Sequence, residues 1–127
     1  MYKKAMNTYV FPFEKLLAWK KAKELVKEIY LATESFPREE TYGLTTQIRR
    51  SAVSVASNLA EGTSRSTQKD QFRFTVMAFS SLMEMINQLV ISEKLGFLDG
   101  NKLDSIREKT EELSRILIAL RKSQESP

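Results

Sequence analysis

The chain has 127 residues, of which 42% are hydrophobic and 28% charged, and its formal net charge is +4. This composition is typical of one soluble globular domain with a buried core, and the lack of cysteine and histidine excludes disulfides, thiolate chemistry, Cys/His zinc sites and imidazole catalysis. The sequence shows neither a signal peptide nor an apolar run of about 18 residues, so we expect a cytoplasmic protein that does not enter a membrane.

Residues 1–12 have no hydrophobic periodicity, and we predict a flexible arm there, followed by a bundle over residues 13–123. The first helix is predicted over residues 14–34, where apolar side chains recur at helical spacing. Its stripe consists of Leu16, Trp19, Val26, Ile29 and Thr33, with Ala22, Leu25 and Tyr30 beside it. Phe36-Pro37 ends this segment, because the residue before a proline is disfavoured in the α region.

The second helix is predicted to begin between Glu39 and Leu44 and to run to Gly62. Its apolar stripe has spacings of four, four, three and four and consists of Leu44, Ile48, Ala52, Val55 and Leu59. Gly62 and the polar residues after it favour a turn. Thr67, with Asp70 three residues later, predicts the N-cap of the next helix.

The third and fourth helices carry sustained heptad patterns. In the third helix the predicted seam is Phe72, Val76, Phe79, Met83, Ile86 and Val90, widened by Leu82 and Leu89; in the fourth it is Leu103, Ile106, Thr110, Leu113, Leu117 and Leu120. Gly96 ends the third helix and Asp99 is the predicted N-cap of the fourth. Four amphipathic helices joined by short loops predict an all-α fold, a single antiparallel up-down-up-down four-helix bundle.

The second and third helices also carry a polar stripe each: Gln47, Arg50 or Ser51, Ser54, Asn58 and Glu61 on the second, and Ser81, Glu84 and Gln88 on the third. Because the two helices are antiparallel across a turn near residue 64, we expect Arg50 to lie near Ser80–Glu84 and Ser54 near Val76–Met77. One interpretation is a packing seam with an Arg50–Glu84 ion pair, which needs full hydrogen bonding if buried. The other is a surface that contacts a ligand or a neighbouring subunit through Arg49, Arg50, Asn58, Glu61 and Arg65.

The positive charge is concentrated in residues 1–50, which carry ten Lys/Arg against six Asp/Glu, whereas residues 51–127 carry ten of each. A basic surface attracts phosphate backbones. The candidate phosphate contacts are Lys20, Lys23, Lys27, Arg49, Arg50 and Arg65. Few aromatic residues are interleaved with them, so base stacking is not strongly indicated.

A catalytic role is not indicated. The nucleotide-binding and nucleophile motifs are absent, and a di-metal site built on Glu61 and Glu84 lacks the histidines that such bundles use. We therefore predict a protein that is not an enzyme and has no cofactor or metal.

Five ordered blocks of the sequence resemble a known family. They are Phe13-Glu14-Lys15-Leu16-Leu17-Ala18-Trp19, Phe36-Pro37-Arg38-Glu39-Glu40-Thr41-Tyr42-Gly43-Leu44, Gln47-Ile48-Arg49-Arg50-Ser51-Ala52, Asn58-Leu59-Ala60-Glu61-Gly62 and Phe72-Arg73-Phe74. Together they are similar to the four-helix-bundle family encoded in intervening sequences of bacterial 23S ribosomal RNA genes, to which the accessory protein of diversity-generating retroelements also belongs. The resemblance covers residues 11–122.

The resemblance implies a protomer that assembles into a ring-like homopentamer with a basic surface. For the retroelement branch it also implies binding to RNA or DNA and to a reverse transcriptase; the sequence does not distinguish the two branches. The resemblance carries over the motif positions Gln47, Arg49, Arg50, Asn58, Glu61, Gly62 and Arg65, and Glu84 is a predicted packing position. Three hypotheses stay open: an oligomeric nucleic-acid-binding protein, a scaffold that docks a polymerase or another protein, and a structural bundle without a specific partner.

Overall fold

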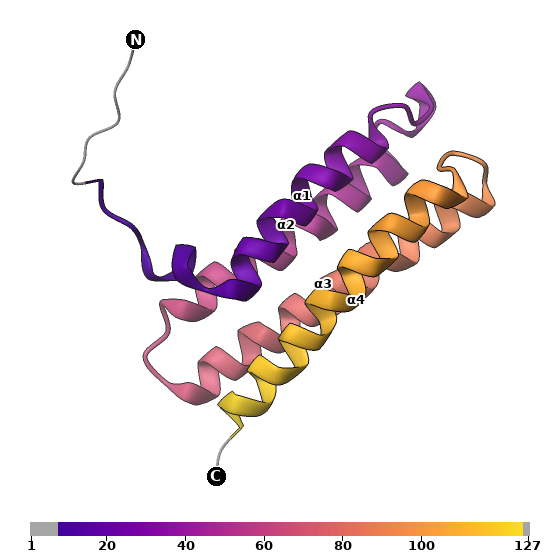
Figure 1. Ribbon diagram of the computed structural model, residues 1–127. Coiled ribbons are helices and arrows are strands. Elements are labelled where there is room, and N and C mark those ends of the chain that lie inside the picture. Colours follow the sequence, from indigo (N-terminus) through magenta and orange to yellow (C-terminus); the bar gives the residue numbers. More distant parts are fainter. Residues whose placement is uncertain (1–7, 126–127) are drawn as a thin grey trace.

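The computed structural model describes residues 8–125, and in this part of the chain four long α-helices form an antiparallel bundle without strands. The helices are α1 (Leu17–Thr33), α2 (Leu44–Thr63), α3 (Gln68–Lys94) and α4 (Gly100–Gln124), with short 3-10 turns η1 (Pro12–Lys15) and η2 (Arg38–Glu40). Figure 1 shows the four helices side by side with alternating directions. The predicted all-α bundle is therefore confirmed. Residues 1–7 of the predicted arm lie outside the described residues.

The predicted boundaries of α3 and α4 are confirmed by their caps. The Thr67 hydroxyl accepts a hydrogen bond of 3.1 Å from the Asp70 backbone N–H, and the Asp99 carboxylate accepts one of 2.8 Å from the Lys102 N–H. Each cap satisfies a backbone donor that the first turn of a helix leaves free. Gly96 has a φ of +83°, a left-handed conformation that glycine adopts without strain and that ends α3.

The first helix begins three residues later than predicted, because the segment before it forms a separate turn. Pro12 opens η1, and the Phe11 N–H donates to the Glu14 carboxylate at 2.9 Å. Leu16 is extended, with φ of −75° and ψ of 124°. The chain therefore bends between η1 and α1, which places η1 against α1 and α2.

The core confirms the predicted stripes of α2 and α4. Its fully buried members there include Ile48, Val55, Ile106, Leu113 and Leu117. These side chains meet along the bundle axis, where each helix buries one apolar face.

In α3 the predicted seam is wrong about the centre of the buried face. Leu82 and Leu89, which were predicted only to widen the seam, are fully buried together with Ala78 and Met85, which it did not include, whereas Met83 is 37% exposed. The reason is that α3 packs against both α2 and α4. Its buried face therefore lies toward both neighbours, and Phe79 of the predicted seam lies at the edge of that face beside Arg121 of α4.

The predicted register of α2 against α3 is also wrong, by four to five residues. Ser54 lies opposite Ser81, with 2.8 Å between their Oγ atoms, and not opposite Val76–Met77. The first turns of α3 extend past the end of α2, so that Gly62 meets Phe74. The Arg50–Glu84 ion pair is not formed among residues 8–125.

Within the described residues, α3 is long and apolar enough to cross a membrane, with a mean hydropathy of 1.4 in its most apolar window. The same composition serves a helix that packs on two neighbours in a bundle, and Ala78, Leu82, Met85 and Leu89 are buried in that way. The expectation that the protein does not enter a membrane stays a prediction.

Candidate nucleic-acid interface

A shallow groove of about 610 Å³ runs between α1 and α2 on the outside of the bundle. Its lining consists of Tyr30, Thr46, Arg49, Arg50, Val53, Ser54 and Ser57. The lining includes two guanidinium groups and four side-chain hydroxyl groups, from one tyrosine, one threonine and two serines, and it includes no carboxylate. The lining therefore offers hydrogen-bond donors and positive charge, which is the chemistry that binds phosphate.

Arg49 joins α1 to α2 and is held in one position. Its Nε donates to the Thr33 hydroxyl at 2.9 Å, and a terminal nitrogen donates to the Tyr30 carbonyl at 3.2 Å. The guanidinium also lies 4.4 Å from the centre of the Tyr30 ring. These contacts use neutral acceptors, so the positive charge of Arg49 is not neutralised.

Arg50 is exposed beside Arg49 and forms neither an ion pair nor a hydrogen bond with residues 8–125. Arg49 is therefore held by its neighbours in the groove, whereas Arg50 is exposed and its donors are free to meet a phosphate.

Lys20, Lys23 and Lys27 are spaced three and four residues apart on α1 and share one edge of that helix with Tyr30. None of the three lysines forms an ion pair with a described residue, and the Lys23 ammonium lies 5.1 Å from the centre of the Trp19 ring. The opposite edge of α1 is different: Lys21 pairs with Glu112 of α4 at 3.2 Å, and Glu28 pairs with Lys109. We call Lys20, Lys23, Lys27, Arg49 and Arg50 the basic face.

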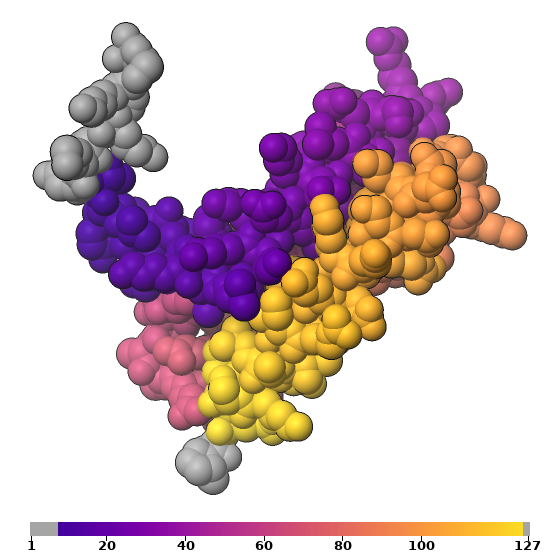
Figure 2. Space-filling view, viewed as in Figure 1, coloured from indigo at the N-terminus to yellow at the C-terminus, as the bar shows by residue number. Residues whose placement is uncertain are grey.

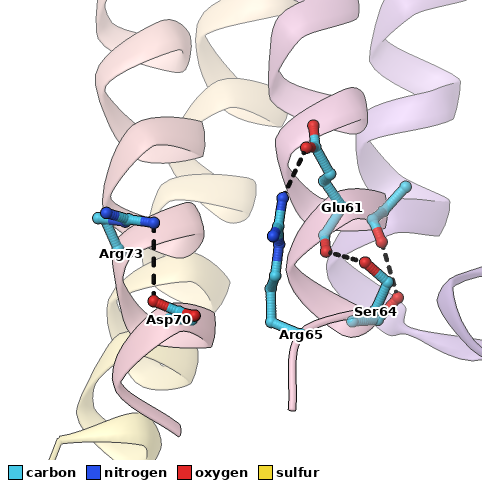
Figure 3. A network of polar contacts seen from close by, with 7 residues as sticks. Glu61, Ser64, Arg65, Asp70 and Arg73 are labelled. Atoms are coloured by element: carbon cyan, nitrogen blue, oxygen red, sulfur yellow. Dashed lines mark hydrogen bonds and ion pairs between the residues drawn. The ribbon is translucent and has the colours of Figure 1, made fainter. Parts of the chain in front are cut away.

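Arg65 does not belong to the basic face. Thirteen residues of helix, about 20 Å, separate Arg50 from the end of α2 at Thr63, and Arg65 lies beyond that end. It donates to the Glu61 carboxylate at 2.9 Å (Figure 3). Its guanidinium lies over the Phe74 ring at 4.6 Å. Arg65, in the α2–α3 connection, is thus neutralised by Glu61 of α2 and contacts α3, whose first turns carry a further pair between Asp70 and Arg73.

The polar stripes of α2 and α3 meet in a hydrogen-bonded seam centred on Gln88, which is 6% exposed. The Gln88 side-chain oxygen accepts from Ser51 at 3.2 Å, and its nitrogen donates to Gln47 at 3.3 Å and to Glu84 at 3.5 Å. A buried amide needs such partners because an unpaired one costs about 1–3 kcal/mol.

Asn58 extends the seam, since its side chain donates to the Ser54 carbonyl at 2.9 Å. The structure therefore places Gln47 and Glu84 at the exposed edge of the seam, Asn58 half-buried beside Ser54, and Gly62 in tight contact with Phe74 of α3. Gln88 belongs to the predicted polar stripe of α3, but the stripe alone does not indicate that Gln88, rather than Ser81 or Glu84, is the buried centre of the seam.

Among residues 8–125, Glu61 and Glu84 are not brought together, and no three acidic side chains gather as a metal site requires. Glu61 pairs with Arg65, while Glu84 receives the Gln88 amide. The two carboxylates thus have separate structural partners.

Comparison with known proteins agrees with the bundle. A family model described as "23S rRNA-intervening sequence protein" matches residues 14–119. The crystal structure of a protein of unknown function from the S23 ribosomal protein family of Bacteroides thetaiotaomicron superposes with a TM-score of 0.73 at 20% identity, over 84% of this chain and 99% of that one. At this identity the similarity shows the fold alone. No curated protein matches the sequence.

Proposed function

The chain belongs to the 23S rRNA-intervening sequence protein family, and on that premise we propose that it is a non-enzymatic, oligomeric protein that binds nucleic acid through the basic face. One observation carries the proposal. The five cations of the basic face have no carboxylate partner among residues 8–125, whereas Lys21 on the other edge of α1 is paired with Glu112 of α4.

Binding of this kind depends steeply on salt, because each phosphate contact releases a condensed counterion. Five contacts correspond to a slope of about −3.5 for a single strand and −4.5 for a duplex in a plot of log K against log salt. Affinity should then fall about 100- to 500-fold between roughly 50 and 200 mM salt. Little preference among sequences is expected, since phosphates carry no sequence information.

Mobility shifts with a structured RNA at these two salt concentrations test the proposal. Arg50→Ala should weaken binding at low salt and reduce the salt slope by about one unit. Arg107→Ala is the matched control, because Arg107 is an exposed, unpaired arginine on α4 in the described part of the chain. Absence of any shift at low salt, or equal losses in the two variants, contradicts the proposal.

The oligomer that we propose is a ring, a homopentamer as the family resemblance implies. It is supported by exposed apolar side chains on the outer surfaces of α2 and α3, namely Val53, Met77 and Ile91, since exposed apolar patches favour association. Light scattering at several protein concentrations measures the mass in solution. A monomer at every concentration contradicts the ring.

A second candidate is an accessory subunit that docks a reverse transcriptase or another protein. It is favoured by an apolar surface at the end of the bundle formed by the α1–α2 and α3–α4 connections (Figure 1), where Tyr42 is 95% exposed and Leu31 and Leu95 are also exposed. Co-purification of a reverse transcriptase with the wild-type protein, and its loss in Tyr42→Ala, would support this candidate. Retention by Tyr42→Ala would contradict the role of this surface.

A further inference from the structure

Four aromatic side chains form a continuous series that leads from the arm to α1. Tyr9 and Phe11 meet edge to face with ring centres 5.0 Å apart, Phe11 and Phe13 are stacked at 6.1 Å, and Phe13 meets Trp19 edge to face at 5.0 Å. Tyr9 is 68% exposed and Phe11 53%. In Figure 2 the indigo arm forms an edge of the molecule above the α2–α3 connection. We call Tyr9, Phe11, Phe13 and Trp19 the aromatic series.

The backbone that carries Phe11 and Phe13 is held by a proline and two hydrogen bonds before any partner arrives. Pro12 fixes the backbone at the start of η1, the Phe11 N–H donates to the Glu14 carboxylate at 2.9 Å, and the Leu16 N–H donates to the Phe13 carbonyl at 3.1 Å. An aromatic side chain that is already ordered loses little conformational freedom on binding. The exposed ring surface is therefore available without a large entropic cost.

The series ends on the basic face. The Lys23 ammonium lies over the Trp19 ring, and Lys20 and Lys27 follow on the same edge of α1. In residues 8–23 the one acidic side chain is Glu14, and its carboxylate accepts the Phe11 N–H. Exposed rings next to uncompensated lysines are the two components from which proteins build sites for single-stranded nucleic acid.

We propose that the protein binds single-stranded nucleic acid, with bases stacked on Tyr9 and Phe11 and the backbone phosphates on the basic face beyond Trp19. This inference rests on the proposed function and specifies its ligand. A duplex keeps its bases stacked on one another and cannot place them on protein rings. The site is hard to recognise in the sequence, because the rings come before the lysines of the basic face. In the described part of the chain the two are joined through the contact between Trp19 and Lys23.

Two partners could cover the exposed rings, a nucleic acid or a second copy of the chain, and the surface charge favours the nucleic acid. The adjoining surface carries the unpaired cations Lys20, Lys23 and Lys27, which attract phosphates directly, whereas a second copy would have to present an acidic surface to them. Apolar burial alone would favour either partner, so the lysines favour the nucleic acid.

Fluorescence anisotropy tests the inference with two labelled probes, a uridine RNA of about 15 nucleotides and an RNA duplex of the same length, at about 50 mM salt. Tyr9→Ala with Phe11→Ala in the full chain should weaken binding of the single strand at least about 10-fold, because stacking on each ring is worth about 5- to 150-fold. Binding of the duplex should change less than about two-fold.

Three further variants separate stacking from general apolar contact and from loss of fold. Phe11→Leu keeps an apolar side chain without a ring and should lose affinity, whereas Phe11→Tyr should retain it. Leu17→Ala removes an exposed apolar side chain of α1 outside the series and should leave both probes unaffected. Circular dichroism checks that each variant is folded.

The outcomes distinguish this inference from the proposed function. If the wild-type protein binds neither probe at low salt, both are overturned. If the double variant binds both probes as well as the wild type does, or loses both equally, the stacking role is overturned and the proposed function stands. A fall in solution mass of the double variant with unchanged RNA binding would assign the rings to contact between copies and would also overturn the stacking role.

Discussion

Gly62 is buried where α2 packs tightly on α3. Its replacement by alanine has two opposite effects on the free energy of unfolding, a gain from helix propensity and a loss from overpacking. A Cβ at this position would lie 3.1 Å from the Phe74 Cβ and 3.8 Å from the Gln71 carbonyl oxygen. The Phe74 Cβ is attached directly to the backbone of α3, so a rotation of the side chain cannot move it away. The new methyl group is accommodated only if the two helices separate.

The magnitudes predict a net loss of stability. Alanine in place of glycine inside a helix is favourable by about 1 kcal/mol, whereas overpacking costs about 1–3 kcal/mol. We expect Gly62→Ala to lower the free energy of unfolding by about 1 kcal/mol, equivalent to a fall in Tm of about 3–5 °C for a domain of this size.

Urea unfolding followed by circular dichroism measures this effect, at one fixed protein concentration because association adds to the apparent stability. Gly100→Ala is the matched control. A Cβ on Gly100 would have nothing within 4 Å, so this variant should be as stable as the wild type or up to about 1 kcal/mol more stable. Equal stabilisation by both substitutions would refute the close approach of α2 and α3 at Gly62.

Three other predictions concern the fold. Ser54→Ala and Ser81→Ala should show a coupling free energy of about 0.5–1.5 kcal/mol in a double-mutant cycle of unfolding, because their hydroxyls share one hydrogen bond; additive effects would count against that bond. Thr67→Ala should cost about 0.5–2 kcal/mol through loss of the α3 cap, and an unchanged urea midpoint would contradict it. Leu113→Ala should cost about 2–5 kcal/mol in the same assay. Ile118→Ala changes an exposed side chain of the same helix and should cost less than half as much; equal costs would contradict the location of the core.

Local signals in the sequence were sufficient for the four helices and for the caps at Thr67 and Asp99. Those features depend on residues close together in the chain. The buried face of α3 was not predictable in the same way. Its centre includes Ala78, whose small size lets the helices approach but adds little to a hydrophobic pattern, whereas Phe79 and Met83 add much and lie at the edge.

The candidate site, too, was predictable only where it depends on residues close together in the chain. The spacing of Lys23 and Lys27 places them on one edge of α1, but only the packing of the bundle decides that this edge borders α2 and Arg49. The separation of Arg65 was readable from sequence, because Glu61 precedes it by four residues and such pairs form on one helix face. The link between the arm and the lysines depends on a ring contact between Phe13 and Trp19, which no periodicity encodes.

The position of the arm bears on how tightly an assembled protein would hold a long ligand. The arm leaves the bundle at the end where the α2–α3 connection lies (Figure 1). In a ring closed by rotation about one axis, every copy of Tyr9 and Phe11 stands at the same height, so all arms border one rim. A strand bound by one arm then meets the next at a high effective concentration. Avidity around the rim, rather than the strength of any single stack, would set the residence time of a long strand, while a short oligonucleotide would report one arm alone.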